Sequence, residues 1–355
     1  MPRLTAVRRF VSNTGARIYR IACEALPGLS ARVYLILGAG PATLVDAGSG
    51  EGRCTEQIVA ALESIAEEHG EDFQPRRIER ILITHAHIDH IGGLADLVGR
   101  TGAQVGAHPF DAPVVSDWDE HAAVFNRRLL DFLEQAGVPG ERHSALLELF
   151  GFAPGRMACV RVDFPLDEQH PLPGLRVIHT PGHSPGHVCI QVGDILLCGD
   201  HILARTIPQQ WPETLAAFTG LRHYLDSLKK ILQTEGTRMA LGGHEPPILG
   251  VRRRVEEIMA AQERRIERVV EIVGGSPSPP CLVDIAQRIY TRQQGFFELL
   301  ALIDVGSRVE YLEQLGRLEV ANRGELRGGS RQPARYRLSR TDSRITTIAP
   351  VGEDA

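Results

Sequence analysis

The chain has 355 residues, 43% hydrophobic and 23% charged, an ordinary balance for a globular protein with one large domain and one smaller domain. Its formal net charge of −5 excludes a chain that is basic throughout, so any nucleic-acid contact must be local. Six cysteines without a CxxC pair favour a reducing compartment. We see no secretory signal and no apolar stretch of the roughly 18 residues that span a bilayer, so we expect a cytoplasmic protein without membrane contact.

The first hundred residues predict strands that alternate with helices. Glycines end the first two strands, and apolar residues at helical spacing mark the helix that follows them. In chain order we expect strands over 31–40 and 41–50, a helix over 55–70, a buried strand over 77–84, a helix over 91–102 and a strand over 103–109.

The middle of the chain interrupts this rhythm. Residues 111–155 contain two apolar patterns of helical period and predict an inserted helical segment within a domain that covers residues 1–250. In chain order we expect helices over 122–138 and 143–152, strands within 175–200, a helix over 213–236 and a short strand over 238–244.

The last hundred residues predict a separate, mostly helical unit. A long helix over 251–274 carries Glu and Arg residues three or four positions apart, which supports an exposed face. The breaker "SPSPP" follows it. Two further helices are expected over 281–291 and 296–318, and then a Gly-rich basic hairpin over 319–339.

Three histidines and an aspartate follow the buried strand in the stretch "ITHAHIDHIGG". Alternate side chains of a strand point to one side, so His85 and His87 should converge, while Asp89 and His90 lie just beyond them. Neutral imidazole and carboxylate are the usual ligands of zinc and similar divalent metals. Because crowding these groups without a cation would be costly, the stretch indicates a metal site.

Further residues of ligand type stand at other strand ends. His183 lies in "HTPGHSPGH", Asp200 in "LLCGDH" and His244 in "LGGHEP", each in a Gly- or Pro-rich loop after an apolar strand. A single histidine in a loop is usually a polar surface residue, so each position alone is a weak signal. Together they stand where ligands aimed from the edge of a rigid sheet are expected.

In this order the motifs "LVDAGSG", "THAHIDHIGG", "TPGHSPGH", "CGD" and "GGHEP" resemble those of the metallo-β-lactamase superfamily, over about residues 15–250. The resemblance implies an α/β fold, an αββα sandwich with metals at one edge. It also implies two divalent metal ions. Zinc is the default expectation, and iron or manganese could occupy the same nitrogen and oxygen ligands.

The resemblance also implies a role for each matching residue. The first metal would be held by His85, His87 and His183, the second by Asp89, His90 and His244, and Asp200 would bridge the two. Asp46 would support the ligand loop, although an aspartate at a strand end is also common in turns. Three histidines lie outside the pattern and are expected to be supporting or surface residues: His179, His187 and His201.

Such a ligand set indicates a dinuclear metal-dependent hydrolase. Two cations about 3.5 Å apart can share a water and bring its pKa towards neutrality, so that a bridging hydroxide attacks a carbonyl carbon or a phosphorus. Asp89 would bind metal and also orient the hydroxide, which makes it the expected catalytic residue. Cys198 lies in an apolar strand and is expected to be a small buried residue rather than a ligand.

Residues 275–340 resemble the winged helix of one branch of that family, the β-lactamase-like protein 2 type, which includes a mitochondrial endoribonuclease. Residues 251–274 would connect this unit to the first domain, and 341–355 would form a loose tail. Between positions 317 and 340 there are seven arginines against two glutamates. These arginines could contact RNA phosphates, or they could be the solvated face of a unit that packs or forms a homodimer.

Two functions follow from these patterns. The first is hydrolysis of a small ester, thioester or lactone, with the insertion as a roof over the metals. Its apolar residues could line an acyl pocket or form the insertion's own core: Phe125, Leu129, Phe132, Phe150 and Phe152. The alternative is an endoribonuclease or phosphodiesterase that acts on single-stranded RNA. We prefer the small-molecule substrate, because the acidic chain and the few aromatic residues of the basic hairpin disfavour binding of single strands.

Overall fold

The computed structural model describes residues 7–150, 155–291, 293–327 and 332–339, which form two compact units. Of these described residues, the first unit contains 7–128 and 155–261, and the second contains 129–150 and those from 262 to 339. The predicted insertion is therefore divided between the two units. The predicted tail, residues 341–355, and Phe152 lie outside the described residues.

The first unit contains a mixed sheet of seven strands in the order β1-β2-β3-β4-β5-β6-β7. Its strands are β1 (Val7–Val11), β2 (Arg17–Leu26), β3 (Leu29–Leu37), β4 (Thr43–Val45), β5 (Arg80–Leu82), β6 (Gln104–Ala107) and β7 (Phe164–Pro165). Neighbours from β1 to β4 are antiparallel, and neighbours from β4 to β7 are parallel. Because parallel strands end at the same edge, the chain after β4, β5 and β6 brings its polar residues to one side of the sheet.

A second sheet of four strands, in the order β11-β10-β9-β8, packs face to face with the first. Its strands are β8 (Arg176–His179), β9 (Val188–Val192), β10 (Ile195–Gly199) and β11 (Met239–Gly242). The core between the sheets includes Ile36 and Leu82 of the first sheet and Ile190 and Leu197 of the second. Every residue of β9 and β10 is buried, which explains their continuous apolar sequences.

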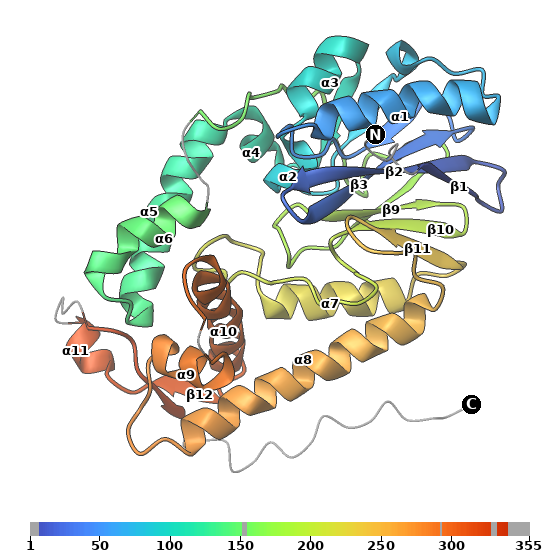
Figure 1. Cartoon of the computed structure of the whole chain (residues 1–355). Helices are drawn as coiled ribbons and strands as arrows, with labels where there is room; N and C mark the ends of the chain where they lie inside the picture. The colour runs from blue at the N-terminus through green and yellow to red at the C-terminus, as the bar shows by residue number, and fades with distance from the viewer. Residues whose placement is uncertain (1–6, 151–154, 292, 328–331, 340–355) are drawn as a thin grey trace, which may run out of the picture. The chain divides into compact units, whose positions relative to one another are not determined.

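Helices cover the outer face of each sheet, as Figure 1 shows. The helices of this unit include α1 (Cys54–His69), α2 (Ile88–Ile91), α3 (Leu94–Thr101), α4 (Ala112–Ser116) and α7 (Leu221–Leu232). Ile58 of α1 and Leu97 of α3 pack on the first sheet. Beside the second sheet, Lys230 of α7 donates a hydrogen bond to the carbonyl oxygen of His179. This order of layers confirms the predicted αββα sandwich.

The structure corrects two predictions about local elements. The helix predicted over 213–236 is wrong in its first part, because α7 begins only at Leu221. Phe218 has a φ of 63° and Gly220 a φ of 94°, so a right-handed helix cannot run through this segment. The hairpin of β1 and β2 was not predicted, because arginines in both strands obscure the apolar alternation.

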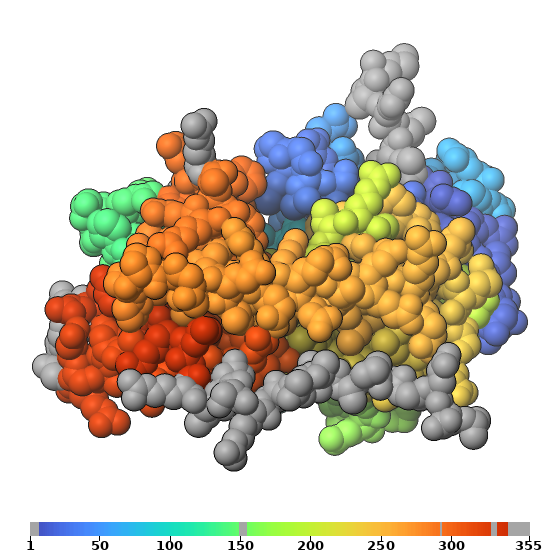
Figure 2. Space-filling view, turned by 90° about the horizontal axis from the view of Figure 1, so that it is seen from below, coloured from blue at the N-terminus to red at the C-terminus, as the bar shows by residue number. Residues whose placement is uncertain are grey.

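Two long helices, α5 (Trp118–Ala136) and α8 (Val251–Gly274), each have residues in both units. The exposed face of α8, part of which is seen in orange in Figure 2, carries the predicted pairs of opposite charge. Arg253 and Glu257 are 2.9 Å apart, as are Arg268 and Glu271. Among the described helices, none combines the length and the apolar sequence needed to cross a bilayer.

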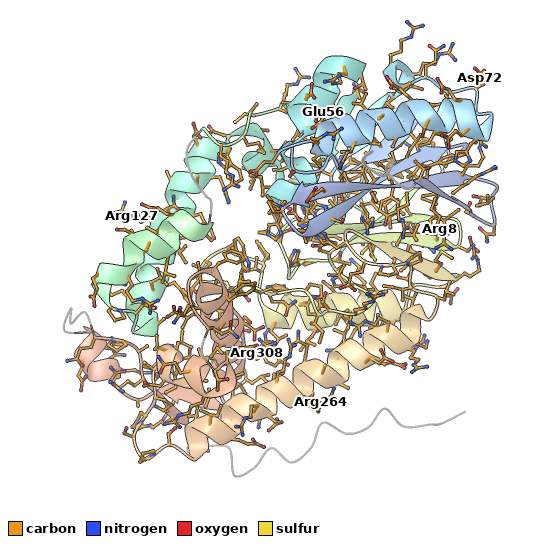
Figure 3. All side chains as sticks on the ribbon, in the orientation of Figure 1. Arg8, Glu56, Asp72, Arg127, Arg264 and Arg308 are labelled. Atoms are coloured by element: carbon orange, nitrogen blue, oxygen red, sulfur yellow. The ribbon has the colours of Figure 1, made fainter. Side chains whose placement is uncertain are left out.

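The second unit is organised around a buried arginine. Its further elements are α6 (His143–Phe150), α9 (Leu282–Ile289), α10 (Phe296–Gln314), β12 (Leu318–Val320), α11 (Arg323–Arg327) and β13 (Tyr336–Leu338). Arg308 of α10, labelled in Figure 3, is 1% exposed. Its guanidinium donates to Gln262 Oε1 and pairs with Asp304 Oδ1, each at 2.7 Å. The hydrogen bond to Gln262 joins α10 to the last part of α8, while the pair with Asp304 lies within α10 and orients the guanidinium.

The predicted basic hairpin consists of β12 and β13, which pair antiparallel, with the short helix α11 between them. Two of the arginines between positions 317 and 340 are neutralised locally, because Arg317 pairs with Glu267 at 2.6 Å and Arg337 with Glu319 at 2.7 Å. Two helices followed by a strand pair agree with the order expected of a winged helix. The winged-helix assignment itself stays a prediction.

Candidate metal centre

The seven predicted ligands come from five segments and meet at one edge of the sandwich. His85 and His87 follow β5, Asp89 and His90 lie in α2, His183 is in the loop between β8 and β9, Asp200 follows β10 and His244 follows β11. Their ligand atoms form three overlapping groups, each within 4.8 Å: His85, His87 and His183; His85, His90 and Asp200; and Asp89, His90 and His244. The chain thus assembles the predicted residues, while their role as ligands stays a prediction.

Asp200 lies between the first and the last of these groups. One of its oxygens is 3.8 Å from His183 Nε2 and 3.1 Å from His244 Nε2. The other oxygen is 3.8 Å from His90 Nε2. A carboxylate in this position can bind two cations at once, which is the bridging role that the sequence resemblance implies for Asp200.

Three buried polar atoms of the site have no hydrogen-bond partner: His90 Nε2, His183 Nε2 and Asp200 Oδ1. Buried polar atoms without a hydrogen bond are rare, because each has lost its hydrogen bonds to water and gained none in the protein. A divalent cation would coordinate imidazole nitrogens and a carboxylate oxygen together. The donor set and its unsatisfied atoms therefore fit the divalent metals implied by the sequence.

Four of the predicted ligand imidazoles are held in place through one ring nitrogen. Such contacts select the tautomer and orient the ring, so that the remaining nitrogen is available to a metal. The Nδ1 partners are Thr84 Oγ1 for His85 (3.1 Å), Asp46 Oδ2 for His90 (2.8 Å), the carbonyl of Gln209 for His183 (2.7 Å) and the carbonyl of Ser30 for His244 (2.8 Å).

Asp46 has the contacts of a supporting residue rather than of a simple turn. Its side chain is buried and accepts hydrogen bonds from the Thr84 backbone N–H at 2.8 Å and from the Thr84 hydroxyl. It also accepts the hydrogen bond from His90. Its φ of 64° is in the left-handed region, which Asp and Asn tolerate better than most residues. Asp46 thus connects the end of β5 to α2.

The charges of the site depend strongly on one another. Burial, reinforced by the neighbouring His183, lowers the pKa of His87 to about 3. Burial also disfavours charge on His244, but the carboxylates of Asp200 and Asp89 outweigh it and raise the pKa of His244 to about 10. Although burial acts against an ionised Asp89, His90 and His244 lower its pKa to about 2. The carboxylates therefore stay ionised and attract positive charge to the site.

Close approach of the backbone explains two glycines in the motifs. A Cβ atom at Gly243 would lie 2.4 Å from Asp200 Oδ1 and 2.6 Å from His90 Cε1. A Cβ atom at Gly92 would lie 1.9 Å from the carbonyl oxygen of Ser49. Any other residue at Gly243 would occupy space between the ligands themselves.

The three histidines outside the motif pattern have different surroundings. His187 is buried, and its Nε2 accepts a hydrogen bond from the backbone N–H of Asp200 at 3.1 Å. His201 is buried beside Tyr224, with ring centroids 5.2 Å apart. His179 is half-buried and stacks on His108 at 3.9 Å. His187 therefore supports a predicted ligand, as the sequence suggested.

Asp111 is a supporting residue that sequence reasoning missed. Its carboxylate is 1% exposed and accepts hydrogen bonds from Ala86 N (3.0 Å), Gly186 N (2.7 Å) and Ser184 Oγ (2.8 Å). It thus joins the loop of His85 and His87 to the loop of His183. The available signal was its place in the loop that follows β6, a strand of the parallel half of the sheet, since Asp46 and His85 also lie in loops that follow such strands.

A cavity of about 590 Å³ adjoins the first ligand group, because His87 and His183 form part of its wall. Much of the remaining wall is apolar and includes Pro109, Phe110, Val124, Trp211 and Phe218. The Trp211 indole stacks on the His87 ring, with centroids 5.4 Å apart and 30° between the planes. An apolar group in this cavity would therefore lie directly beside the predicted metal ligands.

Three of the apolar residues that could have lined an acyl pocket pack elsewhere. Phe125, Leu129 and Phe132 are buried and are absent from the described cavity wall. Leu129 and Phe132 belong to the second unit. These three side chains are core residues, the other option considered from the sequence. Val124, one position before Phe125, lines the cavity instead.

Comparison with known proteins identifies the family of this chain. A model of the metallo-beta-lactamase superfamily matches residues 26–244. The chain is 24% identical over 333 residues to a beta-lactamase-like protein 2 homolog of Drosophila melanogaster, covering 90% of this chain and 94% of the relative. It is 26% identical over 251 residues to a hydroxyacylglutathione hydrolase of Acidiphilium cryptum, covering 70% of this chain and 79% of the relative.

A solved structure with the same fold comes from Thermus thermophilus and is described as a metallo-beta-lactamase family protein. The two chains are 24% identical, with a TM-score of 0.70, and the match covers 90% of this chain and 98% of the other. This similarity supports the fold over both compact units.

Proposed function

Because this chain belongs to the metallo-beta-lactamase superfamily, whose fold implies divalent metal ions, we propose that it hydrolyses small acyl thioesters and related esters or lactones at a dinuclear metal site. The observation that carries this proposal is the apolar cavity beside His87 and His183. It offers an acyl group a place next to the centre where a nucleophile would be generated. The similarity to a hydroxyacylglutathione hydrolase supports a thioester, since hydroxyacylglutathione joins a hydroxy acid to the sulfur of glutathione.

The predicted ligands would divide between two cations as the sequence resemblance implies. His85, His87 and His183 would hold one cation, Asp89, His90 and His244 the other, and Asp200 both. When bound, the two cations would supply an acidified water as nucleophile and an electrophile for the attacked oxygen. Zinc is the metal we propose, although the nitrogen and oxygen ligands also suit iron or manganese.

Asp89 would orient the attacking water. Its Oδ2 lies 3.2 Å from His244 Nε2, where both atoms could bind the second cation, and its other oxygen would be able to accept a hydrogen bond from water. Because its pKa is lowered to about 2, against the effect of burial, the carboxylate is ionised at neutral pH and keeps its acceptor capacity.

A thioester suits a site of this kind for a chemical reason. A thiol, with an ordinary pKa of about 8.5, leaves as a thiolate far more readily than an alcohol does. The reaction therefore has little need of a general acid on the leaving-group side. Esters of poor leaving groups would depend on such an acid, so we expect thioesters to react faster than alkyl esters.

The test uses purified chain loaded with zinc and offered acetyl, butyryl and phenylacetyl thioesters of one small thiol, with released thiol measured directly. We expect turnover that falls at least 100-fold in Asp89→Asn, with metal content measured in parallel. Thioesters that stay intact in the presence of two bound zinc ions would refute the proposal.

RNA cleavage is the second candidate, favoured by the order of α9, α10 and the β12–β13 hairpin in the second unit. Its arginines are partly neutralised by Glu267 and Glu319, which weakens attraction to phosphates. The same preparation, freed of contaminating nuclease, would be offered single-stranded RNA. Cleavage that is lost in Asp89→Asn, together with intact thioesters, would favour this candidate.

A further inference from the structure

Resting on the proposed thioesterase function, we propose that the preferred substrates carry an aryl group on the acyl chain and that Phe110 and Phe218 select it. Phe110 follows β6, and Phe218 lies in the segment before α7. Both line the cavity that adjoins His87 and His183. The reacting carbonyl would lie beside the two histidines, with the aryl ring against the phenylalanine pair.

Phe110 and Phe218 form an aromatic surface that is only partly covered by the protein. Their rings are stacked, with centroids 4.7 Å apart and 8° between the planes. Each residue is nevertheless 45% exposed. Aromatic surface that stays exposed to water contributes no hydrophobic stabilisation. Stacked rings can still contact a third ring through their edges and outer faces. This surface is therefore available to an aromatic group of the substrate.

The backbone of Phe218 shows that its position is maintained against a local preference. Its φ of 63° lies in the left-handed region, which is an outlier for a bulky residue and costs conformational energy. The next residue, Thr219, is buried, and its hydroxyl donates to the carbonyl oxygen of Ala216. Gly220 N–H donates to the carbonyl oxygen of Gly182, close to His183. The surrounding structure thus holds the ring at the cavity wall.

The inner part of the cavity is aromatic as well. Trp211 stacks on His87 and also contacts the ring of Phe125, at a centroid distance of 4.9 Å. A substrate ring would therefore also meet the indole of Trp211, which lines the same cavity as the Phe110–Phe218 pair. A saturated ring of similar volume would lack the edge-to-face and offset contacts that aromatic pairs prefer.

The experiment compares phenylacetyl and cyclohexylacetyl thioesters of the same thiol, because the methylene separates each ring from the carbonyl and reduces the difference in intrinsic reactivity. Each kcat/KM is divided by the rate constant for alkaline hydrolysis of the same thioester to remove what remains of that difference. We expect zinc-loaded protein to favour the phenylacetyl substrate in kcat/KM by about 3- to 10-fold, the effect of one aromatic pair. Phe218→Leu and Phe110→Leu should bring this ratio close to one. Phe218→Tyr should retain it, and Phe297→Leu, at an exposed phenylalanine of the second unit, is the matched control.

Failure of this inference can be separated from failure of the proposed function. Hydrolysis of both thioesters with a ratio near one in the unmodified protein would overturn the aryl preference and leave the thioesterase function standing. An equal loss of kcat/KM for both substrates in Phe218→Leu would also overturn the aryl preference, because a purely structural role of Phe218 would affect both substrates alike. Titration calorimetry with phenylacetate and cyclohexylacetate measures the same preference without turnover, so equal affinities would contradict the inference even if no thioester were cleaved.

Discussion

Asp46→Asn tests the support of the metal centre with little change of shape. Asparagine tolerates the left-handed φ of 64° about as well as aspartate, so backbone strain should be preserved. The carboxylate accepts hydrogen bonds from the Thr84 N–H, the Thr84 hydroxyl and His90 Nδ1. An amide has only one acceptor oxygen, so its NH2 group must face at least one of these donors.

The magnitude follows from the hydrogen bonds that would be lost. Loss of one charge-assisted bond costs about 1.5–3 kcal/mol of folding stability. Poorer orientation of His90 should weaken metal binding by about 10- to 100-fold, as for other residues behind metal ligands. Urea unfolding of the metal-free protein would give the first quantity, and competition for zinc with a chromophoric chelator the second.

The matched control is Asp72→Asn, at the exposed carboxylate labelled in Figure 3, whose ion pair with Arg77 is long at 3.8 Å. Its effect on stability should stay within about 0.5 kcal/mol, as for most surface substitutions. If Asp46→Asn bound zinc as tightly as the unmodified protein, the inferred coupling of Asp46 to the centre through His90 would be refuted.

Three further predictions concern other parts of the molecule. Gly243→Ala should abolish binding of at least one metal, because its Cβ would lie 2.4 Å from Asp200 Oδ1; full occupancy by elemental analysis would contradict this. Arg308→Ala should destabilise the second unit by about 3 kcal/mol, by analogy with other broken buried ion pairs, and leave zinc content unchanged; an unshifted unfolding transition would speak against it. Glu71→Gln should cost about 1–3 kcal/mol at pH 7. Because hydrogen bonds from Arg17 outweigh burial and lower the pKa of Glu71, the wild-type advantage should persist above the unfolded pKa of about 4.3 and shrink as pH falls through the folded value. Urea unfolding as a function of pH measures it, and a constant difference down to pH 2 would contradict this assignment.

Much of the cluster of candidate ligands could be predicted from the sequence, because the determinants are local. His85, His87, Asp89 and His90 lie within six residues, and strand geometry alone makes the first two converge. The sandwich was also predictable, since apolar strands and amphipathic helices alternate along the chain. The interruption of the helix predicted over 213–236 could not be predicted from local sequence. The left-handed backbone of Phe218, which interrupts that helix, is imposed by the surrounding structure.

The sequence by itself determined which side chains could bind divalent metals and that they follow strands which end at one edge. Only the tertiary structure decided what surrounds them: Asp111 meets Gly186, 75 residues away in the chain, and Phe110 stacks on Phe218. It also decided that Leu129 and Phe132 belong to the second unit rather than to the cavity wall. The physical reason is that spacing along a strand is fixed by backbone geometry, whereas burial and contact depend on segments distant in sequence that pack together only in the folded chain.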